Sequence, residues 1–369
     1  MKVKAIELKN YRNYESLDFR PDKNINIIYG NNAQGKTNIL ESLYLAATSK
    51  SHRINKDSEL IENGKDEAHI KVVIEKNSLE YRIDMHLKKH GKKGIAINAI
   101  PIKKAVDLYG IINVVMFSPE DIIMLKGGPE AKRRYIDMEI SQISKLYLEN
   151  LINYNKVLGQ RNALLKKIHF EGKSQDLEML DVWDLQMIKY GSLVIEERIK
   201  FINHLSQLVG QIHSNISDGK EKLEIIYEPS TQIDDFEKSL KAKRDNDIRL
   251  KYSSLGPHRD DLRFLINDKD TKFYGSQGQI RTVALSLKLA EIKIIRDIIH
   301  DDPILLLDDV MSELDEIRQD KLLNTIGDIQ TLITCTGIGE FINSRISVDR
   351  IFEVINGQVF EINGNSLEV

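Results

Sequence analysis

The stretch that decides the fold is Gly30-Asn31-Asn32-Ala33-Gln34-Gly35-Lys36-Thr37, which matches the phosphate-binding pattern GxxxxGK[ST]. A short apolar run, Ile25–Tyr29, leads into it, and apolar residues recur at helical spacing from Asn38 onward. This strand–loop–helix order suits phosphate, because glycines let backbone N–H groups turn inward and the helix N-terminus favours an anion. The sequence therefore predicts an α/β domain that binds a nucleotide.

Two side chains of this loop have predictable roles. Lys36 is expected to reach the β- and γ-phosphates of ATP, and the Thr37 hydroxyl is expected to ligate Mg²⁺. An ordinary glycine-containing turn is the alternative, but it would not need the complete motif in this context. The other candidate nucleotide contacts are the neighbours of these two residues, Gly30, Asn31, Asn32, Ala33, Gln34, Gly35 and Asn38.

A second feature fits the phosphate-binding loop. The apolar run Ile304–Leu307 is typical of a strand buried on both faces, and it ends in Asp308 and Asp309. Open α/β sheets bind ligands at the carboxyl ends of their strands, so Asp308 is predicted on the metal side of the site. Asp309 is predicted to polarise the attacking water as general base. Aspartates also begin turns, but the phosphate-binding loop favours the catalytic interpretation.

The motif Ser276-Gln277-Gly278-Gln279 discriminates among nucleotide-binding proteins. It precedes an amphipathic pattern and offers a hydroxyl, a flexible glycine and the N–H groups of a helix N-terminus, which suit a γ-phosphate. It resembles the signature motif of ABC-type ATPases, which acts on ATP held by another subunit. The resemblance implies an ATP-dependent homodimer in which Ser276, Gly278 and Gln279 contact nucleotide and Ser276 is also catalytic. The same residues could instead form a helix cap.

Two further positions bear on the ABC interpretation. Ser312-Glu313-Leu314-Asp315 is similar to the ABC D-loop, although it could equally be a helix cap. Thr336 stands where many ABC ATPases carry a switch histidine, and a Q-loop glutamine has no clear equivalent. The residue that senses the γ-phosphate is therefore not assigned from the sequence.

The order of patterns along the 369 residues predicts a head that is split in sequence. Alternating residues 69–87 and 95–102 flank a lysine-rich turn and predict an antiparallel hairpin. From residue 132 to about 216, apolar residues repeat every three or four positions, which predicts two long antiparallel helices joined near residues 169–175. Strand–helix alternation then returns. We predict an α/β ABC-type P-loop ATPase head (lobe I, residues 1–131 and 255–369) with an inserted helical lobe II (residues 132–254).

Composition sets limits on function. With 53 basic and 56 acidic side chains the formal charge is −3, so DNA binding cannot be inferred from net charge. Local basic patches are the candidates, Lys92 and Lys93 in the lysine-rich turn and Lys132-Arg133-Arg134, although charged turns are often simply solvated. The single cysteine, Cys335, is expected to be a buried strand residue. No signal-peptide pattern and no apolar run of ~20 residues is present, so we expect a cytoplasmic protein without a membrane segment.

Several stretches in order along the chain together resemble the RecF family of bacterial DNA-repair ATPases. They are Leu8–Tyr14, Gly30–Thr37, Ser51–Arg53, Phe117–Asp121, Gly256–Asp261, Ser276–Gln279 and Asp308–Asp309. The resemblance implies a slow DNA-dependent ATPase that dimerises with ATP at gapped DNA and at junctions of single and double strands. It also implies the partners RecO and RecR, with which the family helps to load a recombinase onto single strands.

The resemblance leaves several points open. By analogy with related heads, Arg12 could meet the α-phosphate of the nucleotide, but it could equally be a surface arginine. His258 and Arg259 follow Gly-Pro and have either a functional role or a place in a turn, with Arg259 paired to Asp260 or Asp261. Ile280 departs from the family, which often has a second glutamine there. A short structural head of the SMC or Rad50 kind is the alternative function, disfavoured because those proteins carry far longer coiled coils.

Overall fold

A six-stranded sheet carries the phosphate-binding loop in the computed structural model, which describes residues 1–54, 56–172, 174–337 and 348–362. The strand order is β15-β14-β3-β13-β12-β8, and all neighbouring strands are parallel except the edge pair β14–β15. The central strands are buried, as their apolar runs predict, and Cys335 is buried in β13. The bounds are β3 (Ile25–Tyr29), β8 (Val114–Phe117), β12 (Ile304–Asp308), β13 (Thr331–Cys335), β14 (Arg350–Ile355) and β15 (Gln358–Ile362).

A second, antiparallel sheet has the order β2-β1-β4-β5-β6-β7. Its alternating residues place one face in a hydrophobic core that also includes residues of α1 (Lys36–Thr48) and of the parallel sheet. The strands are β1 (Lys2–Tyr11), β2 (Tyr14–Phe19), β4 (Glu67–Lys76), β5 (Leu79–Lys88), β6 (Gly94–Ile97) and β7 (Ile100–Pro101).

The predicted hairpin around the lysine-rich turn is confirmed, since β5 and β6 pair antiparallel with Met85 opposite Ile95. The stretch 69–87 is not one strand, however. It turns back at Asn77 and Ser78, whose left-handed φ values of 51° and 61° suit the tight two-residue turn of a hairpin. The polar pair Asn-Ser between two alternating runs was the signal for this turn.

The chain forms two compact units, one of Met1–Ile122 with Arg281–Val369 and one of Ile123–Ile280. The first unit joins segments from both parts of the predicted lobe I, of which residues 55, 338–347 and 363–369 lie outside the described residues. Other elements that lie in the first unit or begin or end in it are η1 (Asp57–Leu60), η2 (Ala105–Leu108), α2 (Pro119–Lys126), α9 (Gln277–Ile299), η4 (Met311–Glu313) and α10 (Glu316–Ile326).

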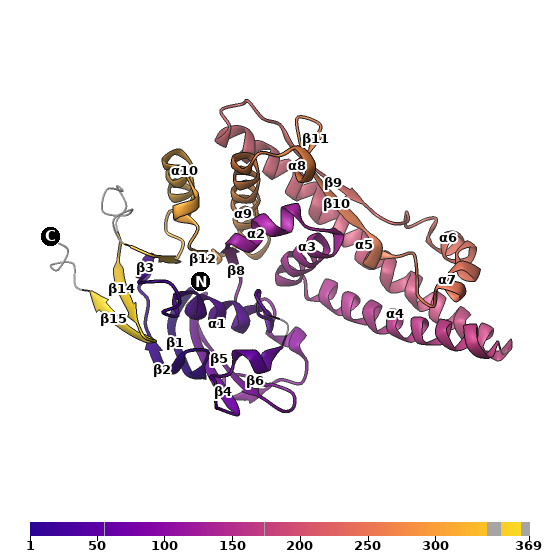
Figure 1. Cartoon of the computed structure of the whole chain (residues 1–369), viewed down its shortest axis with the longest axis horizontal. Coiled ribbons are helices and arrows are strands. Elements are labelled where there is room, and N and C mark those ends of the chain that lie inside the picture. Colours follow the sequence, from indigo (N-terminus) through magenta and orange to yellow (C-terminus); the bar gives the residue numbers. More distant parts are fainter. Residues whose placement is uncertain (55, 173, 338–347, 363–369) are drawn as a thin grey trace. The chain divides into compact units, whose positions relative to one another are not determined.

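Long helices dominate the second unit, as predicted. Figure 1 shows α4 (Lys145–Glu171) and α5 (Ser174–Ile216) side by side, and the described part of their connection is Gly172. Residue 173 of the predicted connection lies outside the described residues. The apolar pattern through 136–158 is divided between α3 (Pro129–Ile143) and α4, because Ser144 starts a new helix by accepting a hydrogen bond from the Tyr147 N–H.

A three-stranded sheet, β11-β10-β9, was not predicted in this unit. β10 pairs antiparallel with β9, so residues beyond 254, which we expected in the head, belong to the second unit up to Ile280. In the described part of the chain, no helix has both the length and the apolarity needed to cross a membrane. The remaining elements are β9 (Leu223–Glu228), α6 (Phe236–Ala242), α7 (Arg244–Leu250), η3 (Pro257–Arg259), β10 (Asp261–Ile266), β11 (Lys269–Asp270) and α8 (Thr271–Tyr274).

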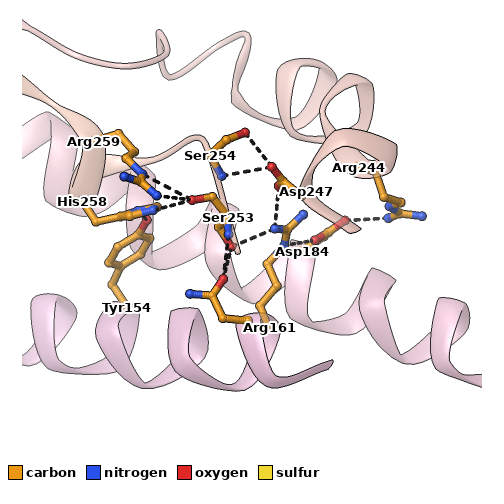
Figure 2. A network of polar contacts seen from close by, with 10 residues as sticks. Tyr154, Arg161, Asp184, Arg244, Asp247, Ser253, Ser254, His258 and Arg259 are labelled. Carbon is orange, nitrogen blue, oxygen red and sulfur yellow. Dashed lines mark hydrogen bonds and ion pairs between the residues drawn. The ribbon is translucent and has the colours of Figure 1, made fainter. Parts of the chain in front are cut away.

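A buried polar network holds the second unit together, and Figure 2 shows its centre at Arg161. This guanidinium is fully buried on α4 and bonds Asp184 of α5 at 2.7 Å, Asp247 of α7 at 2.8 Å and the Ser253 hydroxyl at 2.8 Å. A buried charge is tolerated only when it is paired and hydrogen-bonded. The network therefore fixes the segment that contains Ser253 against the helices.

The residues after Ser253 are held in the same way. Arg259 donates to the Ser253 carbonyl (Figure 2). Its guanidinium lies over the Tyr252 ring at 4.9 Å, so the alternative in which Arg259 pairs with Asp260 or Asp261 is wrong. Asp260 is buried and pairs instead with Arg198 at 3.0 Å. A buried arginine on a distant helix was not visible from the local sequence.

His258 makes this network sensitive to acid. One ring nitrogen lies 2.6 Å from the Tyr154 hydroxyl and the other 3.0 Å from the Ser253 carbonyl oxygen, a pattern that suits a neutral ring. Burial lowers the pKa of His258 from 6.5 to about 4. Because the folded pKa lies below the unfolded one, the unfolded chain takes up the proton first. The contribution of His258 to the free energy of unfolding is thus complete above about pH 6.5 and declines as the pH falls toward 4.

We therefore expect the wild type to lose about 2 kcal/mol more of its free energy of unfolding than His258→Gln when the pH falls from 7 to 5. Urea unfolding at both pH values measures this difference, and common titrations cancel between the two proteins. His90→Gln, at an exposed turn, is the matched control and should behave like the wild type. Equal losses in the wild type and His258→Gln would contradict the assignment.

Candidate nucleotide-binding site

The backbone of the phosphate-binding loop requires its two glycines. Gly30 has a φ of 150°, and a Cβ added there would lie 2.5 Å from the Val354 carbonyl oxygen. Gly35 has a φ of 114°, and its Cβ would lie 2.5 Å from the Asn13 side chain. Both positions combine a left-handed backbone with a close neighbour, which only glycine tolerates. The loop thus has the conformation that its motif predicts.

Lys36 lies at the first position of α1 and is only 4% exposed. Its ammonium donates to the Gly30 carbonyl at 2.7 Å and to the Asn31 carbonyl at 3.1 Å. These neutral acceptors hold the buried charge over the loop. Phosphate oxygens would be stronger partners for the same donors, because hydrogen bonds between ionised groups are stronger than those to neutral carbonyls.

Thr37, Asp308 and Thr334 form a hydrogen-bonded group at the carboxyl ends of the strands. Both threonine hydroxyls donate to the same oxygen of Asp308, each at 2.7 Å. Burial raises the pKa of Asp308, and the two hydroxyls oppose that shift. A hydroxyl and a carboxylate are the hard oxygen ligands that Mg²⁺ prefers, so Thr37 and Asp308 fit this ion.

Asp309 has a left-handed backbone, with a φ of 53°. Its N–H lies 3.0 Å from the Thr334 hydroxyl oxygen and 3.3 Å from the Thr334 carbonyl oxygen. The same threonine therefore contacts both aspartates, through its hydroxyl to Asp308 and through its oxygens to Asp309. Sequence reasoning missed Thr334, whose only signal was its position near the end of the strand that precedes Thr336.

Asn13 and Tyr14 are two further residues that sequence reasoning missed. The Asn13 amide donates to the Gln34 carbonyl at 2.7 Å and accepts from the Asn38 side chain at 2.8 Å. The Tyr14 hydroxyl donates to the Gly35 carbonyl at 3.0 Å. Both belong to the stretch Leu8–Tyr14, which had indicated the family but in which only Arg12 was given a role. They brace the loop from the turn between β1 and β2.

Arg12 forms an ion pair with Glu41 of α1, with nitrogen–oxygen distances of 2.8 and 2.9 Å. Glu41 is fully buried and also accepts from the Ser51 hydroxyl at 2.6 Å. Burial acts to raise the pKa of Glu41, but the bonds from Arg12 and Ser51 outweigh it and leave the pKa lowered. In this conformation Arg12 supports α1, and its contact with a nucleotide stays a prediction.

A hollow of about 370 Å³ opens beside the loop. Thr336, in the place of the switch histidine, is exposed and lines it. The other lining residues come from the end of β3, the loop, the end of β14 and the turn after it, namely Tyr29, Gly30, Asn31, Gln34, Glu353, Val354, Ile355 and Asn356.

In the second unit, the Ser276 motif forms a reciprocal helix cap. The Gln279 N–H donates to the Ser276 hydroxyl oxygen at 3.2 Å, and the Ser276 N–H donates to the Gln279 side chain at 2.9 Å. The cap interpretation is therefore confirmed, and the role of the motif toward a partner's ATP stays a prediction. The end of the D-loop-like stretch also caps a helix, since Asp315 accepts from the Arg318 N–H at 3.0 Å.

The predicted DNA contacts differ in accessibility. Lys132 is 3% exposed and donates to the Leu262 carbonyl at 2.6 Å, so its place in the basic patch is corrected to that of a buried structural residue. Arg133 is half-buried and donates to the Asp260 carbonyl. Lys93 is engaged by Asp57 at 3.0 Å. Lys92 and Arg134 are exposed.

Comparison with known proteins gives this geometry a context. Residues 2–357 match the family described as RecF/RecN/SMC N terminal domain. The DNA replication and repair protein RecF of Lachnospira eligens is 55% identical over 363 residues, 98% of this chain and 100% of that protein. RecF of Clostridium perfringens strain 13 is 45% identical over 364 residues, 97% of this chain and 99% of that one.

Solved structures agree with the sequence matches. The recombination mediator protein RecF-ATP in the RecFOR pathway has a TM-score of 0.91 and 36% identity over 98% of both chains. An Smc head bound to the C-winged helix domain of ScpA has a TM-score of 0.58 at 14% identity over 100% of both chains, a likeness of fold alone.

The phosphate-binding loop and the aspartate that ends β12, on a sheet of this order, define an ABC-type ATPase head. The matches extend over nearly the whole chain and are more specific than the fold. The chain belongs to the RecF family of DNA replication and repair proteins.

Proposed function

We propose that this protein is an ATP-dependent DNA-binding ATPase of recombinational repair at single-strand gaps. ATP closes two copies into a dimer, and slow hydrolysis resets it. The observation that carries the proposal is the group formed by Thr37, Asp308 and Thr334 beside the Lys36 loop. It is a phosphate and metal site in a chain that is 36% identical to a RecF solved with ATP.

The chemistry follows from the residues of the first unit. On ATP binding, Lys36 exchanges the carbonyls of Gly30 and Asn31 for phosphate oxygens. Thr37 and Asp308 would hold Mg²⁺, which neutralises phosphate charge when bound. Asp309 takes a proton from a water molecule while the oxygen of that water attacks the γ-phosphorus. The bond between the γ-phosphorus and the β–γ bridging oxygen breaks, which gives ADP and phosphate.

The dimer proposal concerns the Ser276 hydroxyl. As a helix cap it uses one acceptor lone pair toward Gln279, and its O–H is a donor that the cap does not require. We infer that this donor, with the N–H groups at the start of α9, contacts the γ-phosphate of ATP in a second copy. Each site is then complete only when the partner arrives.

DNA and protein partners are proposed from the family. Gapped DNA and junctions of single and double strands are the expected substrates, and RecO and RecR are the expected partners in the cytoplasm, since related structures are assigned to the RecFOR pathway. Lys92 and Arg134 are the exposed candidates for contact with the DNA backbone. Such contacts would be insensitive to sequence and weakened by salt.

Mass and DNA binding, measured with ATP and Mg²⁺, with ADP and without nucleotide, test the proposal. We expect the protein to dimerise and to bind gapped duplexes only when ATP and Mg²⁺ are present. Nucleotide-independent monomers that ignore DNA would overturn it. A short structural head of the SMC or Rad50 kind would dimerise with ATP but show no preference for gapped over intact duplex.

Asp309→Asn should bind ATP normally but hydrolyse it at least about 100-fold more slowly, because the amide cannot accept the proton of water. Asparagine tolerates the left-handed backbone at this position as well as aspartate does, so the local structure should persist. Single-turnover hydrolysis and the lifetime of the ATP dimer measure the effect, and the dimer should live longer. Asp320→Asn, at an exposed position of α10, is the matched control and should hydrolyse ATP like the wild type. Unchanged turnover in Asp309→Asn would remove Asp309 as the base.

A further inference from the structure

Three side chains with metal-ligating atoms meet on one face of the antiparallel sheet. Glu67 and His69 are two residues apart on β4, so they point to the same side. His86 of β5 lies directly opposite His69 in the strand register. A carboxylate oxygen of Glu67 and one nitrogen of each imidazole all lie within 4.8 Å of one another.

Both imidazoles approach the same carboxylate. The two imidazole rings stack with centroids 4.3 Å apart and an interplanar angle of 19°. The Nε2 of His86 lies 2.8 Å from one Glu67 oxygen, and the Nε2 of His69 lies 3.6 Å from the other. Ligand atoms around tetrahedral Zn²⁺ are about 3.4 Å apart, since each lies about 2.1 Å from the ion. The observed distances bracket that value.

We propose that Glu67, His69 and His86 form a binding site for a transition-metal dication of the Zn²⁺ class. Two imidazoles and one carboxylate suit Zn²⁺ and its neighbours rather than Mg²⁺ or Ca²⁺, which prefer oxygen ligands. The site differs from the Thr37 and Asp308 pair in its ligand atoms, because that pair offers oxygen alone. Its ion links β4 to β5 across the hairpin.

The surroundings define the kind of site. The strand register places Gly94 opposite His86, so the residue of β6 directly opposite that imidazole has no side chain. Both histidines line a hollow of about 650 Å³ on the sheet. Three protein ligands leave one position of a tetrahedral ion for water or an anionic group, and that position is reached from the hollow.

Charged residues near the site affect its affinity for a metal dication. Lys9 lies opposite His69 and Lys88 opposite Glu67, and these cations oppose a bound dication. The acid Asp84 is engaged by Arg82 at 2.7 Å and offers little compensation. We therefore expect weaker binding than in a closed structural zinc site, and binding that weakens in acid as protons compete for the imidazoles.

Co²⁺ titration of the untagged full-length protein without nucleotide tests the proposal, because tetrahedral Co²⁺ has a visible absorption band. The wild type should bind one Co²⁺, Zn²⁺ should displace it, and Zn²⁺ should raise the melting temperature. His69→Ala and His86→Ala should each weaken binding at least roughly tenfold. His90→Ala, in the exposed turn before β6, should bind as the wild type does.

Asp308→Ala separates this site from the nucleotide site and should leave Co²⁺ binding unchanged. Melting curves without metal should show that His69→Ala and His86→Ala are folded. Binding that is equal in His69→Ala and His90→Ala, or that is lost in Asp308→Ala, would overturn the proposal. So would the absence of saturable Co²⁺ binding to the wild type at pH 7.5.

Discussion

Lys36→Ala should abolish ATP binding, with the dissociation constant rising at least about 100-fold. The ammonium makes two hydrogen bonds to loop carbonyls and is 4% exposed, so it already lies where phosphate oxygens would arrive. Each charge-assisted hydrogen bond to phosphate contributes about 1.5–3 kcal/mol, and the variant loses all of them. Alanine is a strong helix former, so α1 should still begin at this position.

A fluorescent ATP analogue or equilibrium dialysis measures the effect on binding. Lys50→Ala is the matched control, because Lys50 is an exposed lysine just after α1 and should leave affinity unchanged. Thermal melting should place Lys36→Ala close to the wild type in the absence of nucleotide. If Lys36→Ala bound ATP within threefold of the wild type, the phosphate-binding role of the loop would be wrong.

Ser276→Ala has the second large effect we expect. It should bind ATP with normal affinity, because the nucleotide is held by the loop of its own chain. It should fail to dimerise with ATP and lose most of its hydrolysis, because the donor offered to the partner's γ-phosphate is gone. The variant also loses the acceptor for the Gln279 N–H, which costs about 1 kcal/mol of stability.

Ser276→Asn separates these two effects. Asparagine is a good N-cap residue, so it keeps the acceptor for Gln279 and restores stability while removing the hydroxyl. We expect Ser276→Asn to melt like the wild type but to stay monomeric with ATP. Sedimentation in the presence of ATP and Mg²⁺ measures the fraction of dimer directly. Normal dimerisation of Ser276→Ala or Ser276→Asn would show that the serine acts only as a cap.

The features that could be predicted from the sequence are those that local patterns determine. The loop motif, the apolar strand before it and the buried strand ending in Asp308 are contiguous runs whose period and flanking residues specify them. The same holds for the long helices of the second unit, which were expected with their apolar spacing. The ordered motifs then indicated the family, because each lies at a chemically constrained position.

The features that could not be predicted depend on contacts between distant residues. The β9–β10 pair joins Leu223–Glu228 to Asp261–Ile266, and the sequence of neither strand indicates which strand it pairs with. Lys132 looks like a surface cation in its basic run, yet the fold buries it against Leu262. The bracing of the loop by Asn13 and Tyr14 requires the three-dimensional position of the β1–β2 turn. In each case tertiary packing decides the role of a residue whose local pattern is neutral.

The neighbours of Gly30 have a consequence for biosynthesis. The loop is translated well before β14, yet Gly30 packs against the Val354 carbonyl and the Asn356 N–H donates to the Gln34 side chain. A ribosome must therefore translate more than 300 further residues before these supports exist. We expect the nascent chain to be unable to hold ATP until β14 has emerged from the exit tunnel.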